Sequence, residues 1–104
     1  MFFRPLMVTG FLLISVLVGM SPVMAGDVFN GDVLYRKHCE SCHGKSGEGL
    51  MPGMADFSRG EGLFSADSQL LDILRGGKGV MPGYGQTLSD QQLRDIVAFI
   101  RTLM

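Results

Sequence analysis

The clearest pattern of hydrophobic and polar positions lies near the C-terminal end of the chain, in the segment SDQQLRDIVAFIRTL over residues 89–103. Ser89 followed by Gln92 three positions later is a capping-box pattern, in which two side chains satisfy free N–H groups at a helix start. The apolar residues then recur at i, i+3, i+4, i+7 and i+10: Leu93, Ile96, Val97, Ile100 and Leu103. This spacing predicts an amphipathic helix with one buried face.

Two further helices are predicted upstream. Asn30 is available as the N-cap of a helix over residues 30–41, and Gly76-Gly77 would stop a helix over residues 66–75. Glycine-rich loops separate the helices, and no convincing alternating pattern of the kind that predicts β-strands is present. The sequence therefore predicts an all-α fold of three to four helices.

Residues 1–25 are predicted to be a secretory signal peptide. Arg4 supplies a positive charge, residues 6–20 are mostly apolar, and residues 23–25 give the small-residue cleavage pattern. The alternative is an uncleaved anchor helix, but the apolar run is short for a bilayer span of about 20 residues. We therefore expect cleavage after position 25, leaving a single exported domain of residues 26–104 in the periplasm.

Charge and size limit what this domain does. The whole chain has a formal net charge of −1, and removal of Arg4 leaves the mature part slightly more acidic. This balance argues against nucleic acid or an anionic membrane surface as the main partner. Chains of fewer than about 80 residues rarely bury enough apolar surface to be stable without disulfides, a metal or a cofactor. We therefore expect another group to fill the middle of the protein.

The segment KHCESCHGKSGEG, residues 37–49, contains both cysteines of the chain, Cys39 and Cys42, followed directly by His43. A redox-active Cys-x-x-Cys needs a βαβ setting, which the chain does not show. A structural zinc site needs four ligands, and His38 and His43 flank the cysteine pair too tightly to complete a tetrahedral shell. Cys-x-x-Cys-His in an exported chain favours attachment of a c-type haem, with both thiols bonded to the haem and His43 on the iron.

On these residues the chain resembles the small class I cytochromes c of bacteria, which are monohaem periplasmic proteins. The resemblance extends over most of residues 26–104, through the stretches NGDVLYRKHCESCHGKSGEG, GKGVMPGYGQTLSD and QLRDIVAFIRTL. It implies the class I cytochrome c fold around one covalently attached haem c. It also implies that Gly31 and Tyr35, a small residue and an aromatic four positions later, pack against the terminal helix.

A second question is which residue binds the iron on the side opposite His43. The resemblance assigns it to Met81, in the Met-Pro sequence before the terminal helix, with Met54 in reserve. His38 is tethered to the same edge as the proximal ligand His43 and is expected to be a surface residue. Pro52 resembles the family proline whose carbonyl oxygen accepts a hydrogen bond from the Nδ1–H of the proximal imidazole and so fixes its ring.

This coordination implies an electron carrier rather than an enzyme, because protein ligands fill both axial positions and leave substrate no open site. We expect a monomer that meets redox protein partners transiently. A small haem enzyme or gas-binding protein with a labile sixth ligand is the alternative, and so is an accessory protein for assembly or haem maturation of a nitrite reductase.

Two features bear on the partner. The stretches DFSRGEGLFSADSQLL and GKGVMPGYG are similar to small cytochromes associated with cytochrome-cd-type nitrite reductases, which implies a role in denitrification. Lys45, Arg75 and Lys78 are expected to form a local basic or mixed patch near the haem edge, able to meet an acidic face of a partner.

Overall fold

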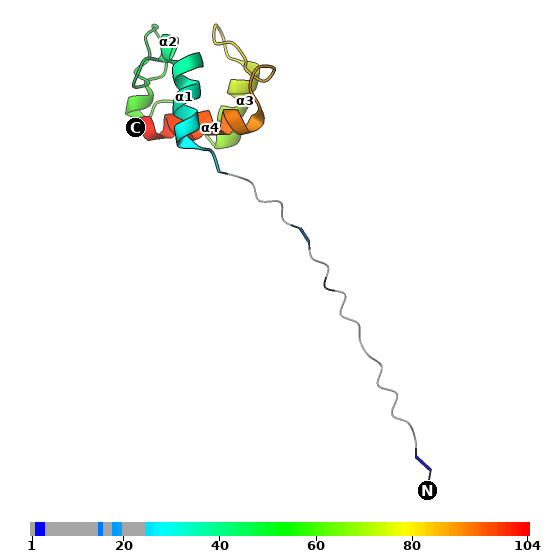
Figure 1. Cartoon of the computed structure of the whole chain (residues 1–104). Helices are drawn as coiled ribbons and strands as arrows, with labels where there is room; N and C mark the ends of the chain where they lie inside the picture. The colour runs from blue at the N-terminus through cyan, green and yellow to red at the C-terminus, as the bar shows by residue number, and fades with distance from the viewer. Residues whose placement is uncertain (1, 4–14, 16–17, 20–24) are drawn as a thin grey trace.

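The computed structural model describes residues 25–104 together with residues 2, 3, 15, 18 and 19; the predicted signal peptide lies mostly outside the described residues. Within residues 25–104 the chain forms four α-helices and two 3-10 helices (Figure 1): α1 (Val28–His38), α2 (Glu40–His43), η1 (Phe57–Arg59), α3 (Asp67–Gly76), α4 (Asp90–Ile100) and η2 (Arg101–Leu103). An isolated β-bridge between Lys78 and Met81 is the one extended pairing in this part of the chain. The predicted all-α fold is confirmed.

The start of α1 differs from the sequence prediction. Its N-cap is Asp27, whose carboxylate accepts hydrogen bonds from the backbone N–H groups of Phe29 and Asn30 at 2.9 and 3.1 Å. The prediction of Asn30 as N-cap was wrong because this side chain has a tertiary partner. Its amide donates to Asp95 on α4 at 2.7 Å. Two good capping residues lie close together here, and the contact with α4 selects between them.

The crossing of α1 and α4 forms the centre of the fold. A Cβ atom at Gly31 would lie 1.9 Å from the carbonyl oxygen of Asp95, so only glycine allows this approach of the two backbones. One turn later, the rings of Tyr35 and Phe99 pack with centroids 5.1 Å apart, and Tyr35 is fully buried. The expected packing of Gly31 and Tyr35 against the terminal helix is therefore confirmed.

Asp95 joins the N-terminal end of α1 to α4. Its side chain is 3 % exposed and accepts three hydrogen bonds, from Asp27 N at 2.8 Å, Asn30 Nδ2 at 2.7 Å and Gln91 Nε2 at 3.0 Å. Burial by itself raises the pKa of this carboxyl, but the hydrogen bonds and the charge of Arg94 outweigh burial and lower the pKa. Asp95 is therefore a charged buried group with its hydrogen bonds satisfied.

The predicted capping box of α4 is present. Ser89 accepts from the backbone N–H of Gln92, and the Gln92 side chain accepts from the backbone N–H of Ser89. The helix then buries the expected apolar face and continues into η2. There Arg101 binds Asp67 at the start of α3 and also the carbonyl oxygens of Leu63 and Ser65. These bonds fix η2 to the start of α3 and to the segment before it.

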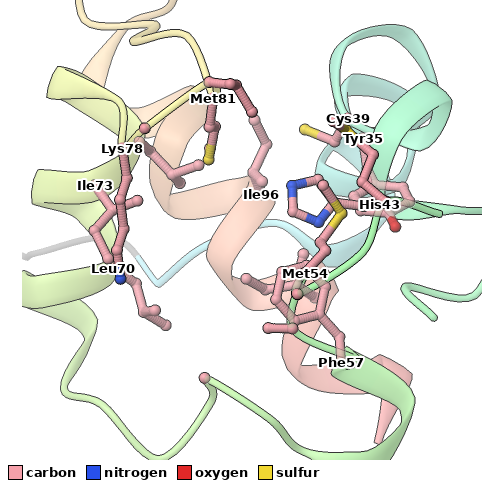
Figure 2. Close-up of a pocket in the computed structure, with 18 of the residues that line it drawn as sticks. Tyr35, Cys39, His43, Met54, Phe57, Leu70, Ile73, Lys78, Met81 and Ile96 are labelled. Atoms are coloured by element: carbon pink, nitrogen blue, oxygen red, sulfur yellow. The ribbon is translucent and has the colours of Figure 1, made fainter. Parts of the chain in front are cut away.

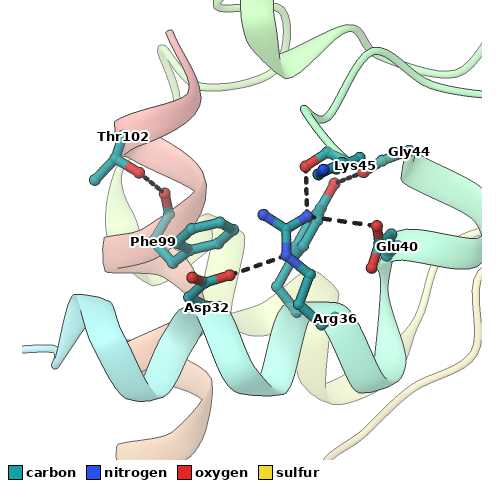
Figure 3. Close-up of polar contacts among 8 residues, drawn as sticks. Asp32, Arg36, Glu40, Gly44, Lys45, Phe99 and Thr102 are labelled. Atoms are coloured by element: carbon teal, nitrogen blue, oxygen red, sulfur yellow. Dashed lines mark hydrogen bonds and ion pairs between the residues drawn. The ribbon is translucent and has the colours of Figure 1, made fainter.

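The first helix ends earlier than predicted, directly before the first cysteine. α1 stops at His38, and the chain bends at Cys39 before the single turn of α2. Tyr35 donates through its hydroxyl to the carbonyl oxygen of Gly44 at 2.6 Å, and Arg36 donates to that of Lys45 (Figure 3). These bonds fix the segment that follows His43 against α1.

No helix in the portion of the chain described by the structure is both long enough and apolar enough to cross a membrane.

Candidate functional site

A cavity of about 500 Å³ lies between the two sides of the fold (Figure 2). Cys39 and His43 line it from one side and Met81 from the other, while Ile96 and Ile100 of α4 form part of its wall. Its lining is predominantly apolar, and its volume falls within the range typical of cofactor sites. The helices therefore leave room in their core for a large apolar group.

Cys39 lines this cavity, whereas Cys42 lines a smaller cavity that shares Cys39 and His43 with it. Cys39 is buried and Cys42 is exposed, and no disulfide joins them. Burial, with a smaller contribution from the charge of Cys42, raises the pKa of the Cys39 thiol to about 11. Redox-active Cys-x-x-Cys motifs lower a thiol pKa instead, so the environment of Cys39 does not favour a redox dithiol.

Within the described part of the chain, no group of three or more His, Cys, Asp or Glu side chains is arranged to hold a metal ion.

His43 projects into the cavity from the side of α2 (Figure 2). Its imidazole stacks on the ring of Phe57, with centroids 5.0 Å apart and an angle of 17° between the planes. Burial lowers its pKa, which favours the neutral imidazole that a metal ion requires.

The expected acceptor for the Nδ1 atom of His43 is not engaged. This buried nitrogen has no hydrogen-bond partner, so the Pro52 carbonyl does not accept from it. Pro52 still lines the cavity, and the aromatic face of Phe57 is what the structure places against the imidazole. Sequence reasoning missed Phe57, since nothing local marks it as a neighbour of a residue fourteen positions away.

Met81 and Met54 lie on different sides of the cavity. Met81 and His43 lie on opposite sides of the cavity, whereas Met54 lies on the same side as His43 (Figure 2). Met81 closes a tight turn through paired backbone hydrogen bonds with Lys78 at 3.1 and 2.9 Å. This turn points the Met81 sulfur into the cavity from the side opposite His43, which is not the side of Met54.

His38 is half-buried rather than a fully solvated surface residue. It lines a smaller cavity of about 180 Å³ together with Met81 and Tyr84, and its ring lies edge-on to that of Tyr84, with centroids 5.5 Å apart. Tyr84 was not predicted as a site residue. An aromatic residue three positions after Met81 was the only available signal.

Comparisons with known proteins give the class of protein. The family described as "Cytochrome C oxidase, cbb3-type, subunit III" matches residues 26–100, so the chain belongs to this family of cytochrome c domains. The chain is therefore a small class I cytochrome c that carries a covalently bound haem c. The predicted cofactor is confirmed.

Curated relatives agree with this assignment. Cytochrome c6 of Thermosynechococcus vestitus is 28 % identical over 91 residues, which cover 84 % of this chain and 80 % of that protein. Cytochrome c6 of a Nostoc species is 27 % identical over 84 residues, covering 77 % and 74 %. The cbb3-type oxidase subunit CcoP of an Azospirillum species is 25 % identical over 87 residues, which are 76 % of this chain but only 29 % of CcoP.

Two solved structures confirm the fold. The c-type cytochrome KustC0563 superposes with a TM-score of 0.61 at 21 % identity, covering 70 % of this chain and 95 % of that one. Cytochrome c6 of the diatom Phaeodactylum tricornutum gives a TM-score of 0.59 at 22 % identity, covering 74 % and 93 %. The predicted class I cytochrome c fold is thus confirmed.

The cavity fits a haem in its chemistry. Its walls are apolar, and an imidazole and a thioether lie on opposite sides. Cys39 lines this cavity, and Cys42 lines the smaller cavity that adjoins it. Histidine and methionine are a recognised axial pair of cytochromes c.

Proposed function

We propose that this protein is a one-electron carrier in which Cys39 and Cys42 hold the haem and His43 and Met81 bind its iron. The placement of His43 and Met81 on opposite sides of one apolar cavity is the observation that carries the proposal. Once both residues bind the iron, no axial position is open to substrate. The haem supplies the one-electron Fe(III)/Fe(II) couple, and the chain's own residues hold it, exclude water from it and set its potential.

Electrons would enter and leave at the exposed edge of the site. Cys42 is exposed, and so are two apolar residues that line the cavity, Met51 at 43 % and Val80 at 84 %. Exposed apolar side chains gathered at a site edge are typical of a docking surface. This arrangement supports transient contact between a monomeric carrier and its redox partners.

Export to the periplasm forms part of the same proposal. The family match begins at residue 26, the first residue after the predicted cleavage site. A Cβ atom on Gly26 would lie 2.3 Å from the carbonyl oxygen of Arg94, so the folded domain already contacts α4 at this residue. Mass spectrometry of the exported protein should find a mature chain that starts at Gly26.

We infer two candidate acceptors for its electrons. The similarity of its loop sequences to cytochromes associated with cytochrome-cd-type nitrite reductase supports a role in denitrification. The match to CcoP domains supports a cbb3-type oxidase as the second candidate. Stopped-flow oxidation of the reduced protein by each purified enzyme distinguishes them. If both reactions are slow, while loss of the protein leaves the reductase without haem, an accessory role is the better account.

The ligand assignment has a direct test. Met81→Ala should remove the weak charge-transfer band of a methionine-ligated ferric haem, lower the reduction potential and allow imidazole to bind. Met54→Ala removes a methionine that lines the same cavity from the other side. This variant should retain the charge-transfer band and the reduction potential of the wild type and should not bind imidazole more readily. If these losses follow Met54→Ala instead of Met81→Ala, the distal ligand is Met54.

A further inference from the structure

The segment that carries Met81 is anchored mainly to one side of the cavity. We call residues 77–88 the distal loop. Three backbone hydrogen bonds attach it to the end of α3, from Gly77 N to Ile73 O at 2.7 Å, from Tyr84 N to Leu74 O at 2.7 Å and from Gly85 N to Arg75 O at 3.2 Å. Figure 1 shows this loop and α2 on opposite sides of the molecule above α4. The loop therefore stands across the cavity from the haem-attachment motif.

One side-chain hydrogen bond joins the distal loop to that motif. The Oη atom of Tyr84 donates to the backbone carbonyl oxygen of His38 at 3.0 Å, although the two residues are 46 positions apart. His38 ends α1, and the last four carbonyl groups of an α-helix have no partner within the helix. Tyr84 thus satisfies a helix-end carbonyl directly before Cys39. A tyrosine hydroxyl has an ordinary pKa of about 10 and is protonated at neutral pH, and burial raises the pKa of Tyr84 further, so this hydroxyl is a donor.

Most of the distal loop is exposed. Residues 78–80, 82, 83 and 85–87 are exposed, Gly77, Met81 and Tyr84 are half-buried, and Leu88, directly before the cap of α4, is buried. Segments with few buried apolar contacts open locally at low free-energy cost. A single interaction across the cavity mouth therefore has a large influence on how often the loop moves away.

We propose that Tyr84 is a positioning residue for Met81: its hydroxyl ties the distal loop to the carbonyl of His38 and so keeps the methionine sulfur on the iron. When the bond breaks, the distal loop is free to pivot on its attachment to α3, and Met81 withdraws with it. The lifetime of this hydrogen bond thereby controls how often the sixth coordination position is open. This inference rests on the proposed ligation by Met81.

The test uses the haem-loaded protein and Tyr84→Phe, which retains the ring and its packing and removes only the hydroxyl. The rate at which imidazole displaces the methionine from the ferric protein is measured by stopped flow at fixed imidazole concentration. We expect this rate to rise about fivefold, the factor that corresponds to a hydrogen bond worth about 1 kcal/mol. The methionine charge-transfer band should also weaken on warming at a lower temperature than in the wild type.

Two matched controls separate positioning from general stability. Thr102→Val also removes a hydroxyl that donates to a backbone carbonyl, that of Phe99, at a residue that does not line the cavity. It should lower the free energy of unfolding without changing the imidazole rate. His38→Ala removes the imidazole ring that contacts Tyr84 but retains the carbonyl acceptor, and should leave the rate close to that of the wild type.

Three results would overturn the proposal. These are an unchanged imidazole rate in Tyr84→Phe, an equal acceleration in Thr102→Val, and an equal acceleration in His38→Ala, which would assign the effect to ring contact. The ligand assignment fails separately, if Met81→Ala itself leaves the spectrum unchanged.

Discussion

Gly31 shows how one hydrogen atom in place of a side chain determines a helix crossing. We predict that Gly31→Ala lowers the free energy of unfolding by about 1–3 kcal/mol, the cost of overpacking a close-packed contact. The added Cβ would lie 1.9 Å from a backbone oxygen of Asp95 and 2.8 Å from the Cβ of Phe99, so the helices must move apart. Urea unfolding of the haem-loaded protein measures the change.

Gly76→Ala is the control for this prediction. Gly76 ends α3, and a Cβ there would meet nothing within 4 Å. This substitution should be neutral or slightly stabilising, since alanine has a higher helix propensity than glycine. Equal destabilisation by the two variants would show that the loss of a glycine, rather than the close approach of α1 to α4, is responsible.

At the residue scale, the sequence was most informative where a motif has one chemical use. Cys39, Cys42 and His43 lie within five consecutive positions, so their closeness in the folded protein follows from the motif itself. The assignment of Met81 as the distal ligand depended on the order of segments in the family that the chain resembles. Phe57 and Tyr84 were not predicted, because each acts on a partner brought close only by tertiary folding.

At the scale of elements, local capping signals predicted α4 better than α1. The capping box of Ser89 and Gln92 is complete within the helix itself, and it formed as predicted. The start of α1 depended on Asp95, which is distant in sequence and takes the Asn30 side chain as a partner. Helix ends that are decided by contacts with another element cannot be located from local sequence alone.

The hydrogen bonds between α1 and α4 through Asp95 lead to a pH prediction. The folded-state pKa of Asp95 is lowered, so its contribution to stability is fully present above the unfolded pKa of about 3.9 and is lost as pH falls through the folded pKa. Asp95→Asn should lower the free energy of unfolding at neutral pH by about 1–3 kcal/mol, because an amide nitrogen cannot accept these bonds. Stability should then fall less steeply on acidification below about pH 4.

Asp72→Asn is the matched control for Asp95→Asn. Asp72 pairs with Arg75 on the surface of α3, and its side chain is 78 % exposed. Exposed ion pairs of this kind contribute about 0–1 kcal/mol. Urea titrations at several pH values compare the two variants. An Asp95→Asn variant with the acid sensitivity of the wild type would exclude this carboxylate as a source of that sensitivity.

At the scale of the whole molecule, the haem is part of the core. We predict that the double variant Cys39→Ala/Cys42→Ala, which cannot attach haem covalently, yields mostly apoprotein with little helix. Without the haem, the apolar walls of the 500 Å³ cavity face water instead of an apolar partner. A domain of fewer than about 80 residues has too little other buried apolar surface to compensate for this loss. Circular dichroism measures the helix content, and a folded, colourless double variant would contradict the prediction.

The charge distribution around the site argues for a smaller basic patch than the sequence suggested. Arg75 binds Asp72 and Asp90 at 3.2 and 3.0 Å, so its charge is largely neutralised. Lys45 is exposed but does not line the cavity, whereas Lys78 is exposed and lies on the cavity wall beside Met81. Any electrostatic guidance of a partner to the haem edge therefore depends chiefly on Lys78.

Lys78→Glu should slow electron exchange with the physiological partner by up to about tenfold at low salt, the lower end of what electrostatic focusing contributes to association rates. The difference from the wild type should shrink as salt rises, because exposed charges are screened over about 8–10 Å at physiological ionic strength. Lys45→Glu makes the same change of charge away from the cavity and should have a smaller effect. Exchange rates measured by stopped flow across a salt series decide the point. If the rate is independent of salt and unchanged by Lys78→Glu, docking depends instead on the exposed apolar residues at the cavity mouth, of which Val80 is the most exposed.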